Sequence, residues 1–200
     1  NYHFLTSIET GRGCPYNCDF YSTTKFFGAK QRFRPIEDVI NEIKQTGRKS
    51  VFFTDDNIIN NRTRAKELFE ALVPLKLRWS GQGSINVARD TEMLELMKKS
   101  GCYLLLVGIE SLDPENIDAN TGKLHVNKIK DYETDIATIH SYGIGLIGCF
   151  VHGFDNDDIS CFKRTLDFIN KVNIDVPQLS LLTPFPGTKL CEKLASENRI

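Results

Sequence analysis

Two cysteines, Cys14 and Cys18, are the residues of this sequence whose type and spacing best suit chemistry. Three residues separate them in a glycine-flanked loop, Gly11–Gly28, which follows a short apolar run at residues 4–8. Thiolates this close together on irregular backbone can bind two corners of one metal cluster. The same pair could also form a disulfide, supply half of a zinc site or remain as ordinary loop thiols, and the spacing alone does not choose among these.

Length and composition suit one ordinary globular domain. The chain has 200 residues, of which 40% are apolar and 26% are charged, and its net charge of −1 gives no general attraction to nucleic acid or anionic membranes. No apolar run is long enough to span a bilayer. We expect a cytoplasmic protein, because the remaining cysteines lie in apolar or helical stretches typical of reduced thiols; they are Cys102, Cys149, Cys161 and Cys191. The chain begins at Asn1 and ends at Ile200 directly after a charged helical stretch, so we expect residues 1–200 to be one domain of a longer protein.

Apolar runs alternate six times with stretches of helical periodicity. The predicted strands are residues 4–8, 50–54, 77–81, 103–109, 146–151 and 178–182. The predicted helices are residues 36–46, 65–72, 91–100, 129–142, 159–169 and a last helix from about 189. The fifth helix has Ile159, Phe162, Leu166 and Ile169 on one face. This alternation predicts parallel strands joined by right-handed crossovers. Six units are too few for a closed eight-stranded barrel, so we expect an open doubly wound sheet or a partial barrel.

Polar residues gather just past the carboxyl ends of the predicted strands. In parallel α/β folds this edge is where functional sites are built. Polar residues also collect wherever strands meet loops, and this general tendency is enough to explain any one of these residues. The tendency explains less well why the loops from strand to helix are long and rich in polar residues. They are Cys14, Cys18, Asp55, Asp56, Asn57, Gln82, Ser84, Glu110, Ser111, Asp155 and the run 183–187.

These motifs resemble those of radical S-adenosylmethionine (radical SAM) enzymes. The signature of that superfamily is Cys-x-x-x-Cys-x-aromatic-Cys. The sequence matches it at Cys14, Cys18 and Phe20 but has Tyr21 at the third cysteine position. Four later strings resemble, in the same order, motifs of the branch that often carries an upstream cobalamin-binding domain: Asp55–Asn57, Gly108–Ser111, Gly153–Asp155 and Pro184–Thr188. The resemblance covers residues 1–200 and implies an α/β fold, a partial (β/α)6 barrel of the radical SAM type.

The resemblance also implies a cofactor site. Cys14 and Cys18 would bind a 4Fe–4S cluster, and S-adenosylmethionine (SAM) would bind beside it. Further positions implied for SAM are Phe20 at the adenine, Asp55 and Asp56 near the methionine amino group, Gln82, Ser84 and Glu110 at the ribose or methionyl end, and Gly148 beside the adenine. For the two aspartates a solvated turn is an equally simple explanation. For Glu110 we favour a functional role, because a carboxylate at the end of an apolar strand is costly without a donor.

Tyr21 leaves the activity open. Tyrosine can bind ferric iron as a phenolate, but its high pKa and hard oxygen suit a low-potential cluster poorly. No other cysteine clearly takes its place. Cys102 is expected at the opposite end of the fourth strand, and Cys161 and Cys191 on helices. Cys149 lies within the fifth strand and could point to either side.

Three hypotheses follow. The chain could be a radical SAM enzyme that cleaves SAM to a 5′-deoxyadenosyl radical, or transfers a methyl group with cobalamin from a domain outside these residues, on an unknown substrate. It could be a degenerate relative that lacks the cluster and acts as a binding or scaffold module. It could be an unrelated barrel enzyme, but that class predicts a late phosphate-binding glycine loop, which the sequence lacks.

Overall fold

The structure is a computed structural model that describes residues 6–16, 18–121 and 127–200. Its centre is one six-stranded parallel sheet whose spatial order follows the chain. The strands are β1 (Thr6–Ile8), β4 (Ser50–Phe53), β5 (Arg78–Gly83), β6 (Cys102–Glu110), β7 (Gly145–His152) and β8 (Val176–Leu181). The short strands β2 (Gly11–Arg12) and β3 (Arg32–Phe33) form a separate antiparallel pair. The predicted six parallel strands are therefore confirmed.

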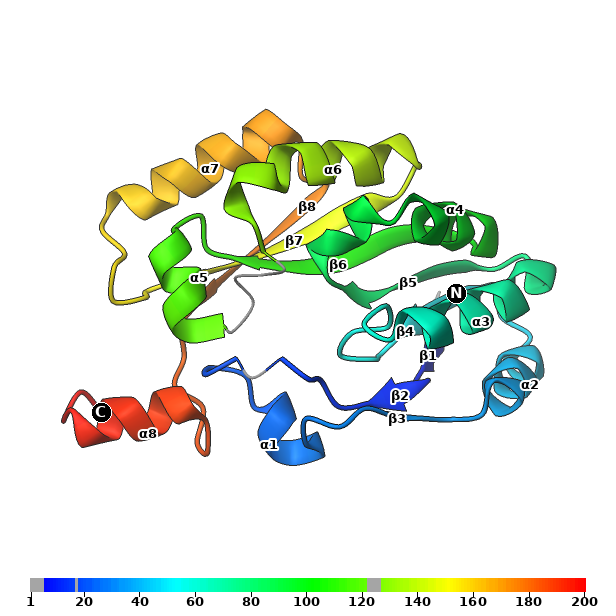
Figure 1. The fold of residues 1–200 in the computed structure, drawn as a ribbon, viewed down its shortest axis with the longest axis horizontal. Helices are drawn as coiled ribbons and strands as arrows, with labels where there is room; N and C mark the ends of the chain where they lie inside the picture. Colours follow the sequence, from blue (N-terminus) through cyan, green and yellow to red (C-terminus); the bar gives the residue numbers. More distant parts are fainter. Residues whose placement is uncertain (1–5, 17, 122–126) are drawn as a thin grey trace, which may run out of the picture.

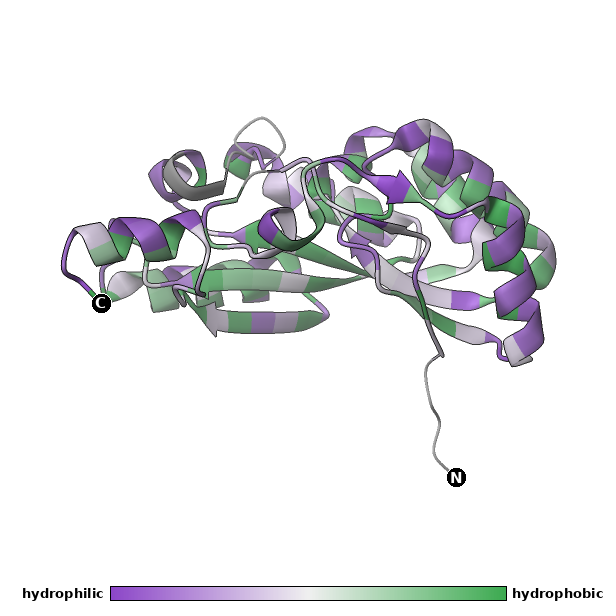
Figure 2. Ribbon diagram, turned by 90° about the horizontal axis from the view of Figure 1, so that it is seen from below, coloured by the Kyte–Doolittle hydropathy of each residue, from purple (hydrophilic) through white to green (hydrophobic). Residues whose placement is uncertain are grey.

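Helices cover one side of the sheet. Figure 1 shows them in an arc along the strands: α2 (Ile36–Thr46), α3 (Arg62–Leu72), α4 (Thr91–Ser100), α6 (Tyr132–Ser141) and α7 (Ser160–Val172). The cysteine loop with α1 (Thr23–Phe27), and α8 (Lys189–Ser196), lie away from this arc (Figure 1). In Figure 2 the helices carry alternating apolar and polar bands, as expected for elements that bury one stripe. Within the described ranges no helix is both long and apolar enough to cross a membrane.

Capping residues set several helix ends where the sequence predicted them. The Asp90 carboxylate accepts a hydrogen bond from the Met93 amide at 3.0 Å and so begins α4. Gly101 ends this helix at a φ of 97°, and an added Cβ there would lie 1.9 Å from the Leu77 carbonyl oxygen. Only glycine fits this junction between α4 and β6.

Trp79 is the largest side chain of the core and is fully buried. Its ring stacks on Phe69 of α3 at 4.9 Å and meets Phe53 of β4 edge-on at 5.5 Å. Its indole N–H donates to the hydroxyl of Ser100 at the end of α4, 3.0 Å away. One side chain therefore joins two strands to two helices near the amino-terminal end of the sheet.

Three features differ from the sequence-based expectation. Helix α5 (Pro114–Thr121) was not predicted, because its stretch has no strong apolar period. Gln82 and His152 lie inside β5 and β7 rather than in the loops that follow. Of the apolar face predicted on the fifth helix, only Ile169 is buried, since α7 turns Cys161 and Thr165 toward the sheet instead. Ile159, Phe162 and Leu166 are exposed.

Replacing Trp79 with alanine is expected to lower the free energy of unfolding by about 3–5 kcal/mol, because it removes a fully buried ring and leaves the Ser100 hydroxyl without its donor. Urea unfolding followed by circular dichroism measures this change. Phe26→Ala is the matched control, since Phe26 is 80% exposed and should change the value by less than about 0.5 kcal/mol. Equal losses in the two variants would contradict the assigned core.

Candidate functional site

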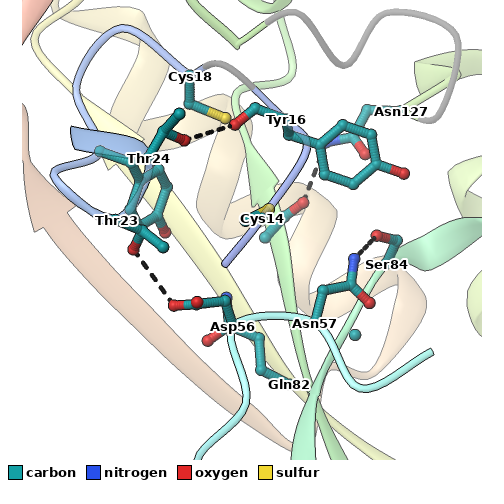
Figure 3. A pocket seen from close by; sticks show the side chains of 13 residues that line it. Cys14, Tyr16, Cys18, Thr23, Thr24, Asp56, Asn57, Gln82, Ser84 and Asn127 are labelled. Carbon is teal, nitrogen blue, oxygen red and sulfur yellow. Dashed lines mark hydrogen bonds between the residues drawn. The ribbon is translucent and has the colours of Figure 1, made fainter. Parts of the chain in front are cut away.

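A cavity opens where the cysteine loop meets the carboxyl ends of β4, β5 and β6. Its empty space is about 710 Å³ when the open solvent at its mouth is counted. Seven side chains that the sequence analysis singled out line it: Cys14, Cys18, Tyr21, Asp56, Asn57, Gln82 and Ser84. Figure 3 shows that their side chains come from three separate segments of the chain. The structure thus brings together most of the predicted site.

The two cysteines lie on the loop side of the cavity. Cys14 is half-buried, whereas Cys18 is buried in a small apolar cluster with Phe20, Phe154 and Leu190. Tyr21 also lines the cavity, with its ring centroid 4.9 Å from that of Phe20. The loop therefore presents two thiols and one phenol where the family signature has three thiols.

These donors do not match a cluster held by three thiolates. Among residues 6–16, 18–121 and 127–200, no group of three or more histidine, cysteine or carboxylate side chains is placed to hold a metal ion. Cys102 lies at the opposite end of β6, where burial raises the pKa of its thiol and keeps it protonated. Cys161 and Cys191 lie on α7 and α8, as predicted.

Asp56 holds the cysteine loop against the end of β4. One carboxylate oxygen accepts from the Gly13 amide at 3.3 Å, and the other accepts from the Thr23 hydroxyl at 3.2 Å. Gly13 has a φ of 96°, and an added Cβ would lie 2.6 Å from the Lys30 carbonyl oxygen. The segment that carries Cys14 is thus fixed on both sides, by a carboxylate and by a close backbone approach.

Asp55 does not line the cavity, and its place near the methionine amino group stays a prediction. Both of its carboxylate oxygens accept hydrogen bonds from Thr10, from the amide at 2.9 Å and from the hydroxyl at 2.6 Å. Burial raises the pKa of Asp55, and these hydrogen bonds oppose the rise. Side chains on consecutive residues point apart, so only one of the two aspartates faces the cavity.

The opposite wall is polar and neutral. The Asn57 side-chain amide donates to the Ser84 hydroxyl at 2.6 Å, and its oxygen accepts from the Ile59 amide at 3.3 Å. Gln82 reaches the cavity from the carboxyl end of β5 (Figure 3). Such a wall can donate to and accept from ribose hydroxyls or an amino acid.

Glu110 is placed differently from the prediction. It is buried at the end of β6 with a φ of 67°, where the pairing of β6 with β7 shifts register, and it lines a separate small hollow that it shares with His152 and Thr165. Sequence alternation could not show this, because the irregularity at Gly108 and Glu110 changes which side the carboxylate faces.

Gly148 and Phe20 also lie outside the cavity lining. An added Cβ at Gly148 would meet Ile174 at 3.2 Å, so this side of Gly148 is closely packed. Its predicted place beside the adenine stays a prediction. Phe20 is buried behind Cys18, edge-on to Phe154 at 5.9 Å. A backbone contact from Phe20 to adenine stays a prediction.

Asn127 was missed by the sequence analysis. Its side-chain amide donates to the carbonyl oxygen of Gly108 at 3.0 Å, and the Tyr132 hydroxyl donates to that of Ile109 at 3.2 Å. Both donors satisfy carbonyls at the irregular end of β6. A single asparagine in a loop carries no periodic signal, so only the tertiary structure shows that it lines the cavity.

Comparison with known proteins places this chain in a family. Residues 8–175 match the model of the Radical SAM superfamily. The chain belongs to the radical SAM superfamily, which confirms the resemblance read from its motifs. The fold agrees: the radical SAM methyltransferase TsrM from Kitasatospora setae, solved with cobalamin and a 4Fe–4S cluster bound, superposes with a TM-score of 0.85 at 22% identity over 96% of this chain and 39% of that chain.

Two curated relatives are methyltransferases. Bacteriochlorophyllide d C-12(1)-methyltransferase of Chlorobaculum tepidum is 36% identical over 205 residues, which cover 99% of this chain and 44% of that protein. Cytidylyl-2-hydroxyethylphosphonate methyltransferase of Streptomyces wedmorensis is 39% identical over 193 residues, which cover 92% of this chain and 36% of that protein. The chain thus spans less than half the length of these relatives.

Tyr21→Cys is expected to convert the loop into a three-thiolate site. Anaerobic reconstitution with iron and sulfide should give about four irons per chain for this variant and much less for the parent. Tyr16→Cys is the matched control, since it adds a thiol to the same cavity at the wrong spacing. Cys18→Ser in the Tyr21→Cys background should remove the gain.

A parent chain that already holds a full cluster would show that Tyr21 or another residue is a competent ligand. A Tyr21→Cys variant that gains no iron would show that the loop no longer fits a cluster.

Proposed function

We propose that residues 1–200 are the SAM-binding core of a cobalamin-dependent methyltransferase of the radical SAM type. The cavity carries the proposal, because it brings the Cys14 and Cys18 loop together with polar side chains from two strand ends. The methyltransferase relatives and the cobalamin in the TsrM structure support the reaction class. Cobalamin would come from a domain outside these residues.

The described side chains account for binding and orientation. Asp56 fixes the cysteine loop, and Asn57 aligns Ser84, so that two walls of the cavity keep a fixed separation. Gln82 and Ser84 can pair with the ribose or the methionyl end of SAM. Close packing of Gly83 against Ile59, where an added Cβ would lie at 2.9 Å, keeps the β5 backbone at the cavity wall.

Tyr21 supports a second candidate. The family uses three thiolates for the cluster that cleaves SAM reductively, and this chain has two in its loop. On that ground the parent chain would be a degenerate relative that binds a SAM-like ligand and acts as a binding or scaffold module. Cleavage of SAM to 5′-deoxyadenosine by the reconstituted parent favours the enzyme, and cleavage by the Tyr21→Cys variant alone favours the degenerate relative.

Binding of S-adenosylhomocysteine is expected without iron, because the polar wall of the cavity is built from the ends of β4, β5 and β6. Calorimetry should detect this binding in the parent chain. Gln82→Leu should weaken it about tenfold, since it removes the amide and keeps the side chain's size. Gln178→Leu is the control, because Gln178 lies exposed on β8 away from the cavity. No binding at millimolar ligand would overturn the proposed pocket.

A further inference from the structure

A second, smaller hollow adjoins the cavity on the side of α3. It encloses about 200 Å³ and is lined by Tyr16, Ile59, Asn60, Arg62, Ser84 and Asn86. Tyr16 and Ser84 line both spaces, so the two share a wall. The hollow and the cavity therefore lie side by side at these two side chains.

Arg62 is the charged residue of this hollow, and its guanidinium lacks a carboxylate. Its Nη2 donates to the Asn86 side-chain oxygen at a long 3.3 Å, and its Nη1 is buried without a hydrogen-bond acceptor among the described residues. Arg34, Arg89 and Arg199 each pair with a carboxylate, but no such pair of Arg62 is found in the part of the chain described. A buried guanidinium N–H without an acceptor is costly.

The residues that line the hollow with Arg62 include no carboxylate. Burial lowers the pKa of Arg62, while the charge of Asp90 opposes the shift, and the guanidinium remains protonated. The Asp90 carboxylate is already engaged as the cap of α4.

We propose that Arg62, with Ser84 and Asn86, forms a subsite for an anionic group, a carboxylate or a phosphate, on the small molecule that occupies the adjoining cavity. A planar guanidinium is the side chain best suited to such groups, since it offers parallel N–H donors to two oxygens. The proposal rests on the proposed function in taking the cavity as a ligand site. The anion can belong to the methionyl end of SAM or to the substrate.

Two variants test the charge. Arg62→Gln removes it. Asn86→Asp keeps Arg62 but puts a carboxylate at the position that now accepts from its Nη2, so the guanidinium is satisfied internally. Asn86→Asp should leave the melting temperature unchanged or higher, which guards against a merely misfolded variant. Arg64→Gln is the matched control: Arg64 also has a buried Nη1 without an acceptor, but its Nη2 donates to the Arg34 carbonyl oxygen at 2.9 Å, and it does not line the hollow.

Three probes separate the sources of the anion by calorimetry. They are S-adenosylhomocysteine, 5′-methylthioadenosine, which lacks the amino-acid part, and inorganic phosphate. If the carboxylate of SAM fills the subsite, Arg62→Gln and Asn86→Asp weaken S-adenosylhomocysteine about tenfold or more and leave 5′-methylthioadenosine within about twofold. If the substrate supplies the anion, both nucleosides are unaffected, and phosphate binding, present in the parent at millimolar concentration, is lost.

The proposal is overturned if neither variant changes the binding of any probe, or if Arg64→Gln has the same effect as Arg62→Gln. A failure of the proposed function gives a different result, because neither nucleoside then binds the parent chain. In that case the phosphate measurement alone shows whether Arg62 forms an anion subsite.

Discussion

The site depends on two consecutive carboxylates at the end of β4. Asp55 accepts two hydrogen bonds from Thr10, and Asp56 accepts from Gly13 and Thr23. The cysteine loop has little regular structure of its own, so its backbone donors need partners from elsewhere. Asp55 fixes the start of the loop in a buried contact, and Asp56 fixes it on either side of the cysteines. Without this pair the thiols would have no defined position relative to β5 and β6.

Much of the fold could be predicted because local signals agreed with the tertiary structure. Apolar runs gave the six strands, and the Asp90 cap and Gly101 gave the limits of α4. The site was harder, because its details depend on the side toward which a residue faces. The register shift at Gly108 and Glu110 turns that glutamate out of the cavity, and one side of Gly148 is closely packed against Ile174. Asp55 and Asp56 look equivalent in sequence, and only their partners distinguish them.

Tyr21 separates two properties that the family normally combines: a cavity for a nucleoside and a complete set of cluster ligands. The polar wall of the cavity comes from the ends of β4, β5 and β6, whose positions are set by core contacts such as those of Trp79. The donor set comes from the loop alone. A change at one loop position can therefore alter metal binding while the space for a nucleoside stays intact. This division explains why the fold and the family are plain in this chain although its third thiol is absent from the motif.

The far edge of the sheet has a consequence for the behaviour of the chain in solution. Every residue of β8 is exposed, and Val176, Leu179 and Leu181 lie on it, while α7 exposes Ile159 and Leu166. Within the described residues β8 pairs only with β7, so its other edge has unused backbone donors and acceptors. An unpaired edge can be a template for strand addition, and Pro177, which has no backbone N–H, weakens this one. At high concentration, these 200 residues would tend to associate through the exposed edge of β8. A ligand bound in the cavity would not prevent this association, because the cavity does not include β8.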